Sequence, residues 1–168
     1  MLDCPRGGAL LLSSFPGLMS GAIPRERRGA IAAGLAALSE RGAAALVTLV
    51  ENSTLEVFDV ADFPDLVAQA GMAWLHLPIA DFSTPDEAFA LKWRAEGAAI
   101  HAKLDRGETI AIHCRAGLGR TGTVAAMILI ERGFAPEEAI SAVRRARPGA
   151  IETDEQERWV RALRSPPR

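Results

Sequence analysis

Apolar residues along this chain form two kinds of pattern, short continuous runs and longer stretches with helical spacing. Four runs have the length of buried strands and end at glycine, proline or charged residues: 9–12, 44–50, 73–77 and 109–113. Helical spacing recurs at 24–41, 62–71, 84–104, 119–132, 136–146 and 153–163. Strands that alternate with helices, followed by a helical C-terminal third, predict an α/β fold with a mostly parallel central sheet flanked by helices.

Two features of this pattern indicate where the centre of the fold and a ligand site lie. The helix at 119–132 is apolar almost all round, so we expect it to run through the middle of the domain. Ligands in such folds bind at the carboxyl ends of strands. Cys114 directly follows the strand at 109–113, which directs attention to that end of the sheet.

Composition and charge limit the classes of function. The chain has 168 residues, 49% of them hydrophobic and 24% charged, which is typical of a single domain over residues 1–168. A formal net charge of −2 gives no general attraction for nucleic acid or a membrane surface. The N-terminal apolar run is broken by Ser13, Ser14 and Pro16, so it fits neither a secretory signal nor a membrane span. We therefore expect a cytoplasmic protein without nucleic-acid or membrane partners.

The two cysteines, Cys4 and Cys114, have different contexts. A chain of this size in a reducing compartment needs no structural disulfide. Cys4 is interpreted as an ordinary thiol near a loose terminus, with a redox partnership with Cys114 as the alternative.

The stretch IHCRAGLGRTG, residues 112–122, joins the last predicted strand to the central helix. We expect positive φ at Gly117 and Gly119, so that successive amides form an anion-binding nest at the helix N-terminus. The amides, the helix and Arg120 favour a nucleophilic Cys114 thiolate, and the planar Arg120 guanidinium can hold two phosphate oxygens. The predicted phosphate-binding loop consists of Arg115, Ala116, Gly117, Leu118, Gly119 and Arg120.

Alternatives to this interpretation concern three side chains. Cys114 could be a buried, inert thiol, but that does not explain why His113, Arg120 and Thr121 accompany it. The Thr121 hydroxyl could hydrogen-bond the sulfur and help it leave, or could only serve the start of the helix. Arg115 adds a cation that either favours highly charged substrates or faces solvent.

Cleavage of a phosphate ester also needs a proton donor for the leaving oxygen. The loop after the strand at 73–77 carries two aspartates. Residues 84–87, Thr-Pro-Asp-Glu, have a capping-box pattern that gives Asp86 a structural role. Asp81 stands free of such a role, so we predict that it is the general acid and base. Three further aspartates flank the helix at 62–71 and are interpreted as caps: Asp59, Asp62 and Asp65.

The segment HCRAGLGRTG resembles the His-Cys-x5-Arg-Ser/Thr signature of the cysteine-dependent dual-specificity protein phosphatases. The segments SSFPG, ENSTLEVFDVADFPDL, HLPIADFSTPDEAFA and RPGAIETDEQERWV resemble the kinase-associated phosphatase, or cyclin-dependent kinase inhibitor three, family. The resemblance covers roughly residues 10–160. It implies the dual-specificity phosphatase fold, catalytic positions at Asp81, Cys114 and Arg120, a phosphocysteine intermediate, and no metal or other cofactor.

Several other residues have weaker signals. Residues 153–156 form a capping-box pattern that explains Gln156 structurally, whereas the resemblance implies that this glutamine orients the hydrolytic water. His113 is expected to hydrogen-bond the backbone and tune the thiolate, and His76 and His101 to be structural or exposed. The run at 144–149 is interpreted as a solvated helix face rather than a pocket rim. Glu51 is a weak candidate for orienting the loop or Arg120.

The sequence thus predicts a metal-independent phosphatase for phosphotyrosine and phosphoserine or phosphothreonine esters, acting on a phosphoprotein such as a protein kinase. One alternative is a phosphoinositide or small phosphoester substrate. Leu118 is evidence against this alternative, and Arg115 is evidence for it. Another is a phosphate-binding or kinase-docking module with little turnover. A sulfur-transfer enzyme would have no need of Asp81.

Overall fold

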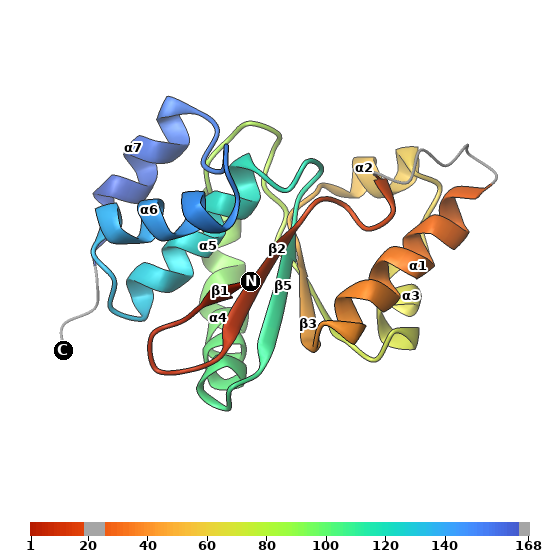
Figure 1. Ribbon diagram of the computed structural model, residues 1–168. Helices are drawn as coiled ribbons and strands as arrows, with labels where there is room; N and C mark the ends of the chain where they lie inside the picture. Colours follow the sequence, from red (N-terminus) through yellow and green to blue (C-terminus); the bar gives the residue numbers. More distant parts are fainter. Residues whose placement is uncertain (19–25, 165–168) are drawn as a thin grey trace.

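The computed structural model describes residues 1–18 and 26–164, and it has one five-stranded sheet of order β1-β2-β5-β3-β4 (Figure 1). The strands are β1 Leu2–Asp3, β2 Ala9–Ser13, β3 Ala43–Thr48, β4 Ala73–His76 and β5 Thr109–His113. β1 pairs antiparallel with β2, and every other pairing is parallel. The predicted α/β fold with a mostly parallel sheet is confirmed.

Seven helices in the described residues cover the two faces of this sheet: α1 Arg27–Glu40, α2 Asn52–Val57, α3 Phe63–Gln69, α4 Glu87–Asp105, α5 Gly119–Glu131, α6 Pro136–Ala146 and α7 Asp154–Ala162. In Figure 1, α1, α2 and α3 lie on one side of the sheet and α4 to α7 lie on the other. Each side has its own apolar core, because successive strand residues point to opposite faces: Ile110 and Ile112 belong to one core and Ala111 to the other.

The central helix behaves as its sequence predicts. Every residue of α5 from Gly119 to Ile130 is buried. Its packing partners include α6, α7 and the sheet. This burial fixes the N-terminal end of α5 firmly against the carboxyl end of β5.

Element ends differ from the prediction for identifiable reasons. The long helix starts at Glu87 rather than Thr84, because the Asp86 carboxylate accepts a hydrogen bond from Phe89 N at 2.8 Å and is itself the N-cap. α1 begins at Arg27, and the predicted start at Pro24 lies outside the described residues. The short helix α2 was not predicted, because six residues are too few to show helical spacing.

Of the three aspartates interpreted as caps, only Asp62 occupies an N-cap position. Asp62 occupies the N-cap position of α3 but makes no side-chain cap hydrogen bond, and its carboxylate pairs with Arg28 instead. Asp65 lies in the first turn of α3, where a negative charge is favourable. Asp59 adopts a positive φ of 54° between α2 and α3.

The expectation of a loose N-terminus is wrong. The β1 strand pairs Leu2 with Leu10 and Asp3 with Ala9, which buries Cys4 beside it. This burial raises the pKa of the Cys4 thiol to about 11. Both Cys4 and Cys114 are free thiols.

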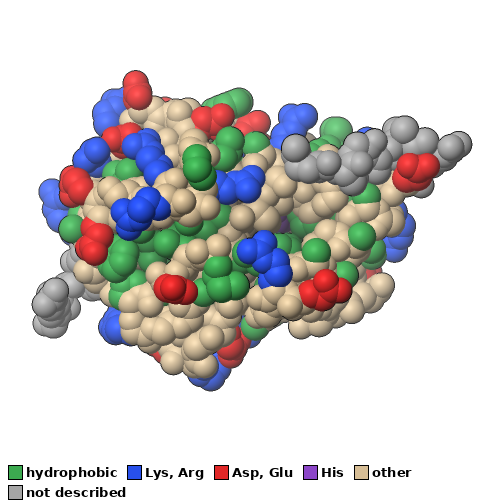
Figure 2. Space-filling view, in the orientation of Figure 1, with side chains coloured by type: hydrophobic (Ala, Val, Ile, Leu, Met, Phe, Trp, Pro, Cys, Tyr) green, Lys and Arg blue, Asp and Glu red, His purple; other side chains and the backbone are tan. Residues whose placement is uncertain are grey.

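Surface charge agrees with the small net charge of the chain. Figure 2 shows basic and acidic side chains interspersed over the face it presents. Within the described ranges, none of the helices is both long and apolar enough to cross a membrane.

Candidate active site

A pocket of about 260 Å³, which we call the cysteine pocket, lies at the carboxyl end of β5. Three segments that are distant in sequence contribute to it: the loop after β4, the loop between β5 and α5, and the start of α7. Its lining consists of Asp81, Phe82, Cys114, Arg115, Ala116, Gly119, Arg120, Glu152 and Gln156. Two members of the predicted phosphate-binding loop, Gly117 and Leu118, do not line it.

The two loop glycines serve different purposes. Gly117 has the predicted positive φ, 76°, and a Cβ there would overlap the Ser13 carbonyl of β2. Its N–H points at Cys114 Sγ, 3.2 Å away. The prediction for Gly119 is wrong: it begins α5 without positive φ, and glycine is required because a Cβ would lie 2.9 Å from the Gln156 amide.

The Cys114 sulfur sits at the base of the pocket, where the side chain is 3% exposed. Thr121 is fully buried in the first turn of α5, and its hydroxyl has no hydrogen-bond partner within the described residues. The predicted hydrogen bond from Thr121 to the sulfur is therefore not formed in this structure. The alternative, a hydroxyl that only lies near the start of the helix, agrees with its position in the first turn of α5, whose N-cap is Leu118.

Arg120 is buried beside the thiol and turns its guanidinium toward the loop after β4. Its Nη1 donates to Ile79 O at 3.0 Å, and its Nη2 lies 2.7 Å from Asp81 Oδ1. The same carboxylate oxygen accepts from Phe82 N at 3.1 Å. Asp81 is thus not the free loop carboxylate that the sequence suggested, because the fold brings it against a buried cation.

His113 holds the backbone of Cys114 through a chain of hydrogen bonds. Its Nδ1 lies 3.0 Å from Cys114 O, a carbonyl that can only accept, so Nδ1 carries the hydrogen. Its Nε2 lies 2.8 Å from Thr48 Oγ1, which in turn accepts from Trp74 Nε1 at 2.8 Å. Complete burial lowers the pKa of His113 to about 4, so the ring is neutral near pH 7.

The other two histidines are structural, as predicted. His76 Nε2 is 2.9 Å from Val50 O, and its ring stacks on Trp74. His101 pairs with Glu131 at 2.7 Å on the opposite side of the sheet from Trp74.

Gln156 makes the capping-box contacts and also reaches the cysteine pocket. It completes the capping box of α7, where its backbone N donates to Thr153 Oγ1 and its Oε1 accepts from Thr153 N. Its Nε2 also donates to Ser83 O at 3.2 Å, in the loop that carries Asp81. The side chain is buried and lines the cysteine pocket.

Sequence reasoning missed the role of Arg147. Its Nε donates to Gly117 O and its Nη2 to Ala116 O, both at 2.9 Å, so it braces the loop from outside the pocket. The interpretation of 144–149 as a solvated face is wrong for this residue, whereas Arg145 is exposed. The only signal was the Pro-Gly pair that follows Arg147, the extended C-cap residue of α6.

Three other side chains complete the pocket rim. Phe82 has a φ of 58° and is 60% exposed, an unfavourable state for an aromatic residue that nothing in the sequence indicated. Glu152 contributes an exposed carboxylate, and Arg115 is both exposed and part of the lining. Glu51 is exposed at the N-cap position of α2, and Arg120 contacts Ile79 O and Asp81 rather than Glu51.

Comparison with known proteins assigns this architecture to a family. The family model described as "Polymorphic toxin system, DSP-PTPase phosphatase" matches residues 20–134. Cyclin-dependent kinase inhibitor 3 of Homo sapiens is 35% identical over 113 residues, which are 66% of this chain and 52% of that protein. A probable protein tyrosine phosphatase type IVA A of Dictyostelium discoideum is 41% identical over 76 residues, 45% of each protein. The chain therefore spans about half the length of these relatives.

Solved structures give the same result. Kinase associated phosphatase, with its catalytic-site cysteine substituted by serine, superposes with a TM-score of 0.66 at 28% identity, over 78% of this chain and 72% of that one. Tk-PTP in its active form gives a TM-score of 0.65 at 32% identity, over 91% of this chain and 89% of the other. By family match, sequence and structure, this chain belongs to the DSP-PTPase family of phosphatases.

Proposed function

We propose that the protein is a cysteine-dependent phosphatase that hydrolyses phosphate monoesters on proteins. The observation that carries this proposal is the meeting of Cys114, Arg120 and Asp81 in one pocket at the N-terminus of a buried helix. A nucleophile, a cation with a planar fork of donors and a carboxyl group are the parts that phosphoryl transfer to cysteine needs.

In the first step, the Cys114 thiolate attacks phosphorus, the S–P bond forms and the P–O ester bond breaks. Once the substrate has displaced Asp81 from Arg120, the protonated Asp81 carboxyl gives its proton to the departing oxygen. Arg120 and the amides of the loop residues that line the pocket, Arg115, Ala116 and Gly119, hold the other phosphate oxygens. In the second step, water attacks phosphorus, the S–P bond breaks and Asp81 takes the proton of the water. The products are the dephosphorylated alcohol or phenol and inorganic phosphate.

Neighbouring side chains support these steps by position. Gln156 is proposed to orient the attacking water, since its amide lines the pocket and holds the loop that carries Asp81. The unpartnered Thr121 hydroxyl is proposed to turn toward the sulfur when the thiolate leaves phosphorus. Nothing in this chemistry calls for a metal ion or another cofactor, and we propose that the enzyme works without one.

The proposed substrates are phosphotyrosine and phosphoserine or phosphothreonine side chains of a phosphoprotein such as a protein kinase, in the cytoplasm. The names of two relatives, cyclin-dependent kinase inhibitor 3 and kinase associated phosphatase, point to such partners. At the pocket rim, the exposed ring of Phe82 offers an apolar surface to the aryl ring of phosphotyrosine.

The test is phosphate release, with a metal chelator present, from matched phosphotyrosine and phosphothreonine peptides. Cys114→Ser should abolish turnover, and Cys4→Ala, which changes the other buried thiol, should leave it intact. Asp81→Asn should lower kcat by about 100-fold or more, mostly on peptides with poor leaving groups. The same change at exposed Asp59 should have no effect.

Two results would change the assignment. Turnover of phosphoinositides or small phosphoesters without turnover of either peptide would replace the protein substrate. Binding of phosphopeptides without turnover of any ester would leave a phosphate-binding module.

A further inference from the structure

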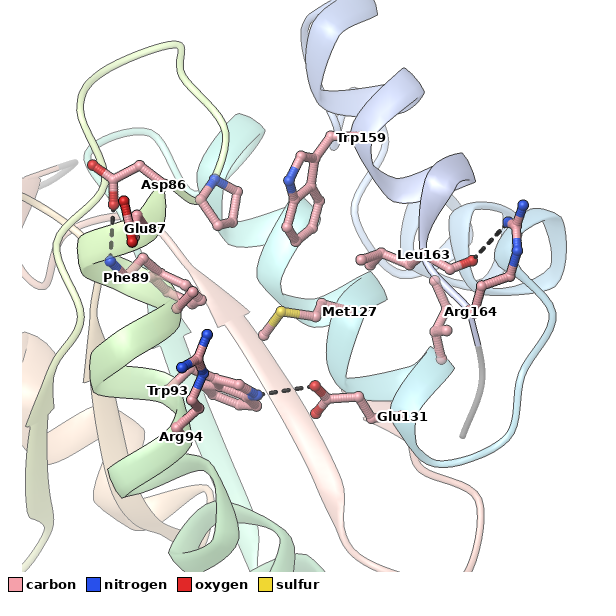
Figure 3. Close-up of a pocket in the computed structure, with 13 residues that line it drawn as sticks. Asp86, Glu87, Phe89, Trp93, Arg94, Met127, Glu131, Trp159, Leu163 and Arg164 are labelled. Atoms are coloured by element: carbon pink, nitrogen blue, oxygen red, sulfur yellow. Dashed lines mark hydrogen bonds between the residues drawn. The ribbon is translucent and has the colours of Figure 1, made fainter. Parts of the chain in front are cut away.

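A second cavity, of about 410 Å³, lies between α4, α5 and α7, and we call it the tryptophan cavity. Figure 3 shows Phe89, Trp93, Met127 and Trp159 pointing into one space from these three helices. Among the described residues, none lines both this cavity and the cysteine pocket. Its volume and its apolar, aromatic walls are those of sites that bind small molecules.

The walls are already fixed in the free protein. Trp93 Nε1 donates to Glu131 Oε1 at 2.9 Å, and the Trp93 ring is nearly parallel to that of Phe89, with centroids 6.0 Å apart (Figure 3). The second oxygen of Glu131 pairs with His101 at 2.7 Å. A preformed cavity loses little side-chain entropy when a ligand enters, which favours binding.

The second indole that lines the cavity is that of Trp159. The Trp159 ring is only partly buried, and its Nε1 is not among the buried polar atoms without a partner in the described residues.

The cavity adjoins an open hollow of about 530 Å³ that carries most of the charge. The two spaces share part of their walls, because four residues line both: Trp93, Arg94, Glu131 and Arg164. The hollow is also lined by Asp105, whose carboxylate pairs with Arg132 at 2.9 Å. With Glu131 bonded as described above, both carboxylates of the hollow already have partners.

Three guanidinium groups at the hollow have no carboxylate partner. Over residues 1–18 and 26–164, the side chains of Arg6 and Arg94 make no hydrogen bond or ion pair, and Arg164 donates only to backbone carbonyls. At the far end of the tryptophan cavity lie Asp86, which caps α4, and Glu87. Taken together, the tryptophan cavity and the hollow are thus apolar in the middle, acidic at one end and basic at the other.

We propose that the tryptophan cavity and this hollow together bind an amphiphilic anion, such as a medium-chain fatty acid. The acyl chain lies between Trp93 and Trp159, and the carboxylate lies toward Arg94. Repulsion by the exposed carboxylates of Asp86 and Glu87 disfavours the opposite orientation. This site does not depend on the proposed phosphatase activity.

The test is titration of the protein with decanoate, below its micelle concentration, followed by tryptophan fluorescence. Two of the three tryptophans of the chain line the cavity, so the signal should saturate with ligand. Affinity should rise roughly tenfold for each two-carbon extension from octanoate to dodecanoate, because each added methylene is buried. Cys114→Ser should bind decanoate as the wild type does, which separates this site from the cysteine chemistry.

Two variants locate the ligand. Ala90→Phe fills the cavity from α4 and should weaken decanoate binding by tenfold or more. Arg94→Gln removes an exposed cation at the head-group end and should weaken it about two- to fivefold. Arg145→Gln makes the same charge change on α6, outside both spaces, and should have no effect.

Three outcomes would overturn the proposal. One is a signal that does not saturate with decanoate. Another is equal or tighter binding of decylamine, which would show that the site prefers a cationic ligand. The third is unchanged affinity in Arg94→Gln, a variant of an exposed side chain that stands as a test even if Ala90→Phe fails to fold.

Discussion

Acid should destabilise this protein through His113 in a window that the structure defines. The ring is fully buried and neutral, with its pKa lowered from 6.5 to about 4, so the folded state resists protonation while the unfolded chain accepts it. Stability should therefore be unaffected above about pH 6.5 and should fall as the pH drops toward 4. The full penalty from this shift is about 3 kcal/mol, of which about 2 kcal/mol arises between pH 7 and pH 5.

The assay is urea unfolding, followed by circular dichroism, of wild type and His113→Asn across this range. Asparagine does not titrate, yet it can keep a donor toward Cys114 O in place of Nδ1. Carboxylates titrate equally in both proteins, so they cancel in the difference. We expect wild type to lose about 2 kcal/mol more than the variant between pH 7 and pH 5. Parallel stability curves for the two proteins would refute the buried neutral histidine.

Three other predictions test the surroundings of the cysteine pocket. Arg147→Ala removes two charged hydrogen bonds to the loop and should lower kcat/KM by about tenfold or more, whereas the exposed Arg145→Ala should not. Gly119→Ala forces a Cβ against a side chain held by the α7 capping box, so both the melting temperature and the activity should fall. Gly29→Ala, with open space around its Cβ in α1, should instead stabilise by about 0.5 kcal/mol. Phe82→Gly relieves a positive φ, so the free energy of unfolding should rise by about 1 kcal/mol. The ratio of kcat/KM for the phosphotyrosine peptide to that for the phosphothreonine peptide should fall, and an unchanged ratio contradicts the role of Phe82 at the pocket rim.

The sheet and the central helix could be predicted because their patterns are strong. The four predicted strands are present, with ends that differ by two residues at most, and the helix at 136–146 is found with its predicted bounds. Apolar continuity marks buried parallel strands and a buried helix without reference to the rest of the chain. The two-residue β1 strand carries no such pattern, since only its pairing with β2 defines it.

The residues of the cysteine pocket also differ in whether the sequence could identify them. Asp81, Cys114 and Arg120 could be named because each lies at a strand end or in a loop with a chemical signature. Arg147 could not, because its two acceptors are backbone carbonyls about thirty residues away that only the folded chain brings near. The Gly119 error has a similar origin: the reason for glycine there is the Gln156 side chain, which is distant in sequence.

The ion pair between Arg120 and Asp81 sets a charge threshold on what can occupy the cysteine pocket. Apart from Cys114, the lining carries two positive charges, from Arg120 and Arg115, and two negative ones, from Asp81 and Glu152. A monovalent anion such as chloride would only exchange one single-charge partner of Arg120 for another. A phosphate monoester dianion brings a second charge and can displace the carboxylate. Monovalent anions such as chloride should therefore compete poorly with a phosphorylated substrate for this pocket, whereas inorganic phosphate, the product, carries the charge needed to bind there.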